Sequence, residues 1–341
     1  MLKKIYNSVV QFVKEEYKFL LCMIVFYIVC MWPVNYYIVI GGGISDVGTR
    51  IVVEDGYDSK GSFNISYVSE LKGTLLTYGL SYIIPSWDRE SMDGYKYSEE
   101  DNYDDIEFRG DIDLKSANGS AIKTAYSLAN KKYTEISSKI YVIATFDEYE
   151  TNFQVQDQLL EVDGKQFETV EEYSNYLQKF EKNDGVVVKV KRDDETREIR
   201  CKIYEENERK IFGVALQIVK EYDTNPDVEI KFKSSESGPS GGLITTLEIY
   251  DKLTKADLTN SLKIAGTGTV DSAGNVGSIG GVKYKLIGAD AGDADVFLVP
   301  AGKNYEEAIK VKDEKKLKVK IISVKSVEEA VEKLSKLKSN N

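Results

Sequence analysis

The longest uncharged stretch of the chain covers residues 19–40, FLLCMIVFYIVCMWPVNYYIVI. About 20 consecutive apolar residues are enough for a helix to span a bilayer. Trp32, Tyr36 and Tyr37 lie near the end of this stretch, where aromatic rings favour the membrane interface, and Pro33 can end or kink a helix there. A cleaved signal peptide, the alternative, usually has a shorter apolar core followed by an A-x-A-like site. The pattern therefore predicts one uncleaved transmembrane helix over residues 19–40.

Basic residues flank this stretch unequally. Residues 1–18 contain four lysines, whereas the 20 residues after the stretch contain only Arg50 and Lys60. Because positively charged flanks remain on the cytoplasmic side, the N-terminal residues 1–18 are expected in the cytoplasm and everything after residue 40 outside it. The pattern thus predicts a single-pass protein of the cell membrane.

Residues 41–138 read as a β-rich, irregular region next to the membrane. Residues 50–53 and 63–67 are β-branched or alternating, which predicts strands, and residues 122–132 have the spacing of an amphipathic helix. Between residues 99 and 113 lie eight carboxylates and one basic residue. Their spacing does not match an EF-hand loop, so the charge pattern favours a solvated acidic loop over a calcium site.

Residues 139–208 alternate between short strand patterns and one helix. Strands are expected at residues 139–146, 158–162, 186–191 and 196–204. A helix is expected from residue 170 to 180, with Thr169 as its N-cap and Glu172 three residues later. The pattern predicts a compact β/α domain.

Residues 209–341 form a longer α/β pattern. Strands are expected at residues 227–232, 263–270, 296–299 and 318–324, and a hairpin turn at 271–275. Helices are expected at residues 240–254 and 282–291, and Ser326 with Glu329 forms a capping box for a last helix. We therefore predict an α/β domain with mixed strand directions.

The composition excludes several kinds of site. The net charge is −11, which argues against a nucleic-acid partner, because phosphate binding needs a basic face. The chain has no histidine and only three cysteines, so the usual zinc and non-haem iron ligand sets are missing. Neither a metal nor an organic cofactor is expected.

The absence of histidine also limits the nucleophiles. A serine hydroxyl needs a base, and without imidazole the main remaining choice is a lysine kept neutral by desolvation. Ser240 follows Gly238-Pro239 and opens a predicted helix, whose N-terminus favours an oxyanion. Lys283 follows a run of small and apolar residues that allows close packing. Each motif is equally compatible with a purely structural turn, since spacing alone does not show that the two residues meet.

Several motifs in order resemble the proteolytic domain of the Lon family of serine proteases. The motifs are SGPSGGL at 237–243, GTGTV at 266–270, GNVGSIGGVKYK at 274–285, ADVFLVP at 294–300 and ISVKSVEEA at 322–330. The resemblance covers nearly all of residues 211–338. It implies a Lon-type α+β domain with a mixed sheet and a serine endopeptidase activity.

The resemblance also implies roles for single residues. Ser240 matches the family's nucleophile, Lys283 its base and Thr267 the threonine that supports the lysine. The backbone around Pro239, Ser240 and Gly241 would stabilise the oxyanion. One departure is Ser237, where the family often has aspartate, so the hydrogen bonding of this loop is expected to differ.

Residues 139–208 resemble a PDZ domain of the bacterial protease type, carried by VQDQLLEVDGKQFETVEEYSNYL and DGVVVKVKRDDETREIRCKI. The family usually has glycine where Gln156 stands, and the loop that binds peptide carboxylates is not recognisable. Capture of peptide C-termini and a role as a spacer domain therefore both remain open.

Together these features resemble the membrane-anchored, PDZ-containing Lon-like serine proteases. The chain has no G-x-x-x-x-G-K-[ST] stretch, so ATP is not expected as a partner. The resemblance implies an ATP-independent endopeptidase that cleaves exported, unfolded or membrane proteins outside the cytoplasmic membrane, and a homo-oligomeric ring. The alternative is a catalytically inactive surface scaffold or adaptor that binds peptides through the PDZ-like domain.

Overall fold

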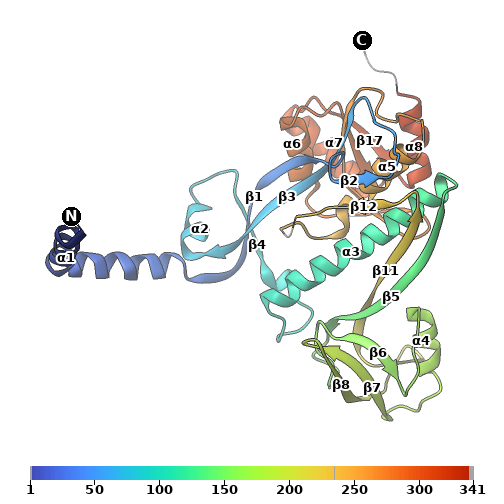
Figure 1. The fold of residues 1–341 in the computed structure, drawn as a ribbon, viewed down its shortest axis with the longest axis horizontal. Helices are drawn as coiled ribbons and strands as arrows, with labels where there is room; N and C mark the ends of the chain where they lie inside the picture. Colours follow the sequence, from blue (N-terminus) through green and yellow to red (C-terminus); the bar gives the residue numbers. More distant parts are fainter. Residues whose placement is uncertain (1, 234, 338–341) are drawn as a thin grey trace. The chain divides into compact units, whose positions relative to one another are not determined.

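The computed structural model describes residues 2–233 and 235–337 (Figure 1). The chain divides into two compact units. The first contains residues up to 41 together with residues 69–95, and the second contains residues 42–68 and those from 96 onward. Two strands, β1 (Pro33–Asp46) and β3 (Ser62–Thr74), have residues in both units.

The first unit contains the helix α1 (Leu2–Cys30) and a small strand pair. In the pair, β1 runs antiparallel to β4 (Asp88–Ser91), with Tyr36 opposite Ser91. The short helix α2 (Leu75–Leu80) begins with a capping box in which Thr74 and Thr77 bond each other's backbone N–H groups. A 3-10 turn, η1 (Met92–Tyr95), completes the unit.

The predicted transmembrane helix over residues 19–40 is wrong in its second half. Helix α1 ends at Cys30, and β1 begins at Pro33. Only residues 19–30 of the uncharged stretch are helical, a length of about 18 Å at 1.5 Å per residue, against about 30 Å of bilayer hydrocarbon. The earlier part of α1 carries lysines and glutamates. Within residues 2–233 and 235–337, no helix combines the length and the apolar character needed to cross a membrane.

The second unit holds a parallel sheet with the strand order β17-β16-β13-β3. Strands β13 (Lys263–Gly266) and β16 (Val296–Pro300) lie at its centre, and β17 (Lys320–Val324) follows β16. Side chains alternate between the two faces: Ile264 and Leu298 enter one hydrophobic core, and Ala265 and Phe297 enter another. Each face is therefore covered, as parallel sheets require.

Helices supply the other half of both cores. Helices α5 (Gly242–Leu253) and α8 (Val327–Ser335) share one core, and α6 (Val282–Ala291) and α7 (Lys303–Lys315) share the other. The N-cap predicted at Ser326 is confirmed, since its side chain accepts a hydrogen bond from the Glu329 N–H. Two short antiparallel pairs complete this region, β2 (Ile51–Val53) with β12 (Val228–Ile230) and β14 (Thr269–Val270) with β15 (Val276–Gly277). A third pair, β9 (Tyr204–Glu206) with β10 (Arg209–Ile211), lies beside the helix α4 (Val170–Leu177).

A long helix, α3 (Tyr103–Leu128), replaces the solvated acidic loop predicted over residues 99–113. The Asn102 side chain accepts hydrogen bonds from the N–H groups of Asp104 and Asp105, and Asp105 bonds back to Asn102, which forms a capping box. Carboxylates in the first turn of a helix are favoured by its dipole. The acidic residues therefore start a helix rather than keep the chain irregular.

The remaining elements form a five-stranded antiparallel sheet with its own core. Its strand order is β11-β5-β6-β7-β8, with the bounds β11 (Val214–Asn225), β5 (Lys132–Thr145), β6 (Gln158–Val162), β7 (Gly185–Arg192) and β8 (Glu195–Lys202). Helix α4 (Val170–Leu177) begins at the predicted N-cap Thr169, whose side chain accepts from the Glu172 N–H. Gln156 adopts φ +81°, a conformation that favours glycine, which is the residue that the PDZ pattern usually has at this position; nothing in the structure explains the glutamine.

Candidate functional site

Ser240 lies in a 3-10 turn, η2 (Pro239–Gly241), directly before α5. The preceding Gly238 has φ +82°, which a side chain would strain, and its N–H donates to the carbonyl of Gly110 on α3 at 2.8 Å. A Cβ on Gly110 would lie 3.0 Å from Cβ of Ser237. Helix α3 thus holds the turn closely from one side.

The carbonyl oxygen of Ser240 is fixed by two donors from the end of β13. It accepts a hydrogen bond from the Gly268 N–H at 2.8 Å and one from Oγ1 of Thr267 at 3.1 Å. Thr267 is fully buried, and the Leu243 N–H donates to Gly268 at 3.0 Å. The resemblance implied a role for Thr267 beside the lysine, whereas the hydrogen bond of its hydroxyl goes to the serine turn.

The N-terminus of α5 has no side chain capping its backbone N–H groups. Neither η2 nor α5 has a side-chain cap. A Cβ on Gly241 would lie 2.9 Å from Cδ1 of Ile65 on β3, so a larger residue here would push this side chain aside. An uncapped helix N-terminus beside a serine presents backbone N–H groups and a positive dipole end to developing negative charge.

Lys283 is the second residue of α6, whose N-cap is Gly281 with φ +70°. The side chain is half-buried, and its Nζ lies 4.9 Å from the ring centroid of Tyr284. The fully enclosed lysine of this motif is instead Lys285, which is 5% exposed. The expectation of a buried base is therefore met only in part at Lys283.

Strand β3 supports both motifs. A Cβ on Gly241 would meet Ile65, and a Cβ on Gly281 would meet Val68 at 2.8 Å. Ile65 and Val68 are three residues apart, about 10 Å along a strand. Side chains three residues apart on a strand point to opposite faces, so the two motifs, 43 residues apart in sequence, contact β3 from opposite sides.

Two further residues brace the site, and the sequence reasoning missed both. The side chain of Asn304, at the start of α7, makes two hydrogen bonds to the backbone of Ile279, accepting from its N–H and donating to its carbonyl, both at 2.9 Å. These two hydrogen bonds fix the chain just before Gly280-Gly281. Arg50 pairs with Glu236 at 2.5 Å and lies 5.3 Å from the ring of Phe232, next to the segment that leads to Ser240. For Asn304, the available sequence signal was an asparagine two residues after Gly302.

One carboxyl on α5 titrates near neutral pH. Burial raises the pKa of Glu248 to about 7, although Lys252 lies 3.3 Å away and lowers it. Glu248 is 2% exposed, so its charged form is poorly solvated.

No candidate metal site is present in the described part of the chain. Residues 2–233 and 235–337 contain no group of three or more metal-binding side chains.

Comparison with known proteins assigns the two folded regions of the second unit. Residues 216–336 match the Lon protease (S16) C-terminal proteolytic domain, and residues 116–203 match the PDZ domain. The chain therefore carries a serine peptidase domain of the Lon type. A PDZ domain precedes it.

Curated relatives agree with the Lon assignment. Lon protease from Desulfatibacillum aliphaticivorans is 35% identical over 98 residues, which are 29% of this chain and 12% of the relative. Lon protease from Neorickettsia sennetsu is 32% identical over 120 residues, 35% of this chain and 14% of the relative. The chain thus spans only a small fraction of the length of these relatives.

Solved structures similar to this chain include two PDZ domains of SdrC-like proteins. The one from Listeria monocytogenes has 20% identity and a TM-score of 0.21, covering 23% of this chain and 85% of that one. The one from Listeria innocua has 20% identity and a TM-score of 0.22, covering 23% and 92%. At such scores the PDZ assignment rests on the family match over residues 116–203.

Proposed function

We propose that this chain is an ATP-independent serine endopeptidase in which Ser240 is the nucleophile and Lys283 the general base. The observation that carries the proposal is the Ser240 turn, held by Gly268 and Thr267 at the uncapped start of α5 within a Lon-type domain. Lys283 is proposed as the base because it is the first lysine of GGVKYK, the motif that holds the base in Lon-type domains, and it lies within the residues matched to that domain.

The proposed reaction follows from these groups. Neutral Lys283 takes the proton of Ser240 as its oxygen attacks the peptide carbonyl. Backbone N–H groups around Pro239–Gly241 hold the oxyanion, as an uncapped helix N-terminus favours. Lys283 then donates its proton to the leaving amine, and water hydrolyses the acyl-enzyme.

The substrates and the location form the second part of the proposal. Exported, unfolded or membrane polypeptides are the proposed substrates, cleaved outside the cytoplasmic membrane, without ATP. Support for a membrane association comes from the second half of α1, where apolar side chains are exposed on every side: Phe19, Leu21, Met23, Ile24, Val25, Phe26, Tyr27, Ile28 and Val29. The lysines before them favour a cytoplasmic N-terminus. A ring of several copies remains part of the proposal by resemblance to Lon-like domains.

The PDZ domain offers the alternative function, a catalytically inactive scaffold that binds peptides. A specific observation favours peptide binding: β8 is an edge strand of the five-stranded sheet and lies within the residues matched to the PDZ domain, and edge strands can pair with an extended peptide. Such binding is compatible with proteolysis, so the two functions separate only on the reactivity of Ser240.

The test is acylation of Ser240 by a serine-directed probe, read by mass spectrometry of the peptide that contains it. Labelling is expected in the unmodified chain and in Ser237→Ala, the neighbouring serine, but not in Ser240→Ala. Lys283→Ala is expected to abolish both labelling and cleavage of unfolded casein, while Lys310→Ala, an exposed lysine on α7, retains both. An unlabelled Ser240 in a folded chain would instead favour the scaffold.

A further inference from the structure

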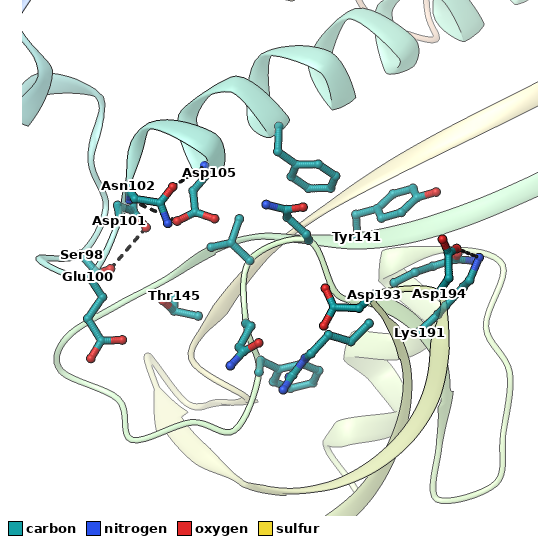
Figure 2. A pocket seen from close by; sticks show the side chains of 17 residues that line it. Ser98, Glu100, Asp101, Asn102, Asp105, Tyr141, Thr145, Lys191, Asp193 and Asp194 are labelled. Atoms are coloured by element: carbon teal, nitrogen blue, oxygen red, sulfur yellow. Dashed lines mark hydrogen bonds and ion pairs between the residues drawn. The ribbon is translucent and has the colours of Figure 1, made fainter. Parts of the chain in front are cut away.

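A cavity of ≈580 Å³ lies between the start of α3 and the PDZ sheet, apart from the serine turn (Figure 2). One wall comes from residues 98–108, and the other from β5, β6 and the turn between β7 and β8. Helix α4 contributes no lining residue within the described chain. This hollow is therefore distinct from a groove between an edge strand and the PDZ helix.

The charge of the cavity is negative. Its lining includes five carboxylates, Glu100, Asp101, Asp105, Asp193 and Asp194, and two cations, Lys191 and Arg192. Both cations have partners, because Lys191 pairs with Asp194 at 2.7 Å and Arg192 pairs at 2.6 Å with Asp157, which does not line the cavity. Two more of the carboxylates are also paired, Asp101 with Arg109 at 2.9 Å and Asp193 with Arg197 at 3.6 Å, so the negative charge comes mainly from Glu100 and Asp105. In Figure 2 the side chains of Glu100 and Asp193 stand at opposite sides of the hollow. The cavity thus favours a cationic ligand.

The uncharged residues that line the cavity are of types that can bind a polypeptide. Phe108 and Tyr141 meet edge to face with their ring centroids 6.0 Å apart, and Phe153 adds a third aromatic ring. Three glutamines also line the cavity, of which Gln154 and Gln156 are exposed and Gln158 is half-buried. A carboxamide can donate and accept, as the peptide backbone does, and aromatic faces attract cations.

We propose that this cavity is an exosite that binds an extended polypeptide segment carrying lysine or arginine. The carboxylates hold the basic side chain, the glutamines pair with the backbone, and the aromatic rings cover the aliphatic stem. The proposal goes beyond the proposed function, because it adds a second contact for a substrate remote from the cleaved bond.

The cavity and the serine turn contact the same part of α3. Asn102 and Phe108 line the cavity, and Gly110 holds the Gly238 N–H. From Asn102 to Gly110 the helix rises about 12 Å. An extended chain covers this distance with about four residues. Phe108 and Gly110 are about 200° apart around the helix, so a substrate anchored by a basic residue would have to pass around α3 to reach Ser240.

The experiment uses the full chain with Ser240→Ala, so that the probe is bound but not cut. The probe is a fluorescein-labelled 12-residue peptide of Gly, Ser and Val with three lysines, and matched probes replace the lysines with glutamine or glutamate. Fluorescence anisotropy at low salt is expected to rank the affinities lysine, glutamine, glutamate. Glu100→Gln/Asp193→Asn is expected to raise the Kd of the lysine probe about 3- to 10-fold, from two exposed charges.

The matched control removes two carboxylates of the same region that do not line the cavity, Glu99→Gln/Glu148→Gln. This control is expected to leave the Kd within about twofold. Equal binding of the three probes, or equal loss in both double variants, would overturn the exosite. Because the readout is binding to an inactive chain, such a failure leaves the acylation test of Ser240 untouched.

Discussion

Thr267 allows the sharpest test of how the serine turn is held. Its hydroxyl donates to the Ser240 carbonyl at 3.1 Å from a fully buried position. Thr267→Val keeps the shape and removes this hydrogen bond, while the Gly268 N–H still satisfies the same carbonyl. Because no acceptor is left without a partner, we expect a loss of only about 1 kcal/mol in the free energy of unfolding.

Activity is expected to fall far more than stability. A reacting atom displaced by about 1 Å can cost about 100-fold in rate. We therefore expect kcat/KM for an unfolded substrate to fall about 10- to 100-fold in Thr267→Val. The effect is expected in kcat rather than KM, because the turn carries the nucleophile and does not bind the length of the substrate.

The control is Thr254→Val at the other end of α5. The Thr254 hydroxyl makes the same kind of bond, to the carbonyl of Tyr250 at 3.0 Å. Both variants are expected to lose similar stability in urea, but only Thr267→Val should lose activity. Full activity in Thr267→Val would refute the reasoning, and a shifted pH profile with unchanged kcat would show that the threonine acts on the lysine instead.

Three further outcomes follow from the same structure. Gly110→Ala is expected to lower kcat about 10-fold in an assay of casein cleavage, since its Cβ would lie 3.0 Å from Cβ of Ser237; an unchanged kcat would show that α3 does not hold the turn. Asn304→Leu removes both side-chain hydrogen bonds to the backbone of Ile279, and we expect thermal unfolding to show a loss of about 1–3 kcal/mol in the free energy of unfolding, together with lower activity. Glu248 holds a proton in the folded state up to about pH 7, whereas the unfolded chain releases it near 4.5, so stability is greatest below pH 4.5 and falls by up to about 3 kcal/mol as pH rises through 7. Urea unfolding between pH 4.5 and 8 should show this slope, and Glu248→Gln should flatten it; an equal slope in the variant would contradict the assignment.

Much of the PDZ and peptidase regions could be predicted from local patterns. Helix α6 and strand β6 have the bounds that the spacing predicted, and the caps at Thr169 and Ser326 form as expected. These features depend on residues close in sequence, where periodicity and capping act.

The errors come from competing local signals. The acidic pattern of residues 99–113 predicts a solvated loop, but Asn102 and Asp105 form a capping box that stabilises the first turn of α3. The uncharged stretch 19–40 was read as one helix, but the β-branched and aromatic residues after Pro33 pair with β4.

The braces of the site could not be predicted because they join distant parts of the chain. Gly110 and Gly238 are 128 residues apart, and Arg50 and Glu236 are 186 apart. A single sequence shows the types of these residues but not their pairing. The motifs at Ser240 and Lys283 could be named in advance because their order and spacing match a known domain.

The measurement closest to the central claim is the rate at which a serine-directed probe acylates Ser240 as a function of pH. The proposed pair predicts a rising limb governed by one group well below the usual lysine value of about 10.4, and loss of that limb in Lys283→Ala. Identical profiles in both chains would contradict a lysine base at this position.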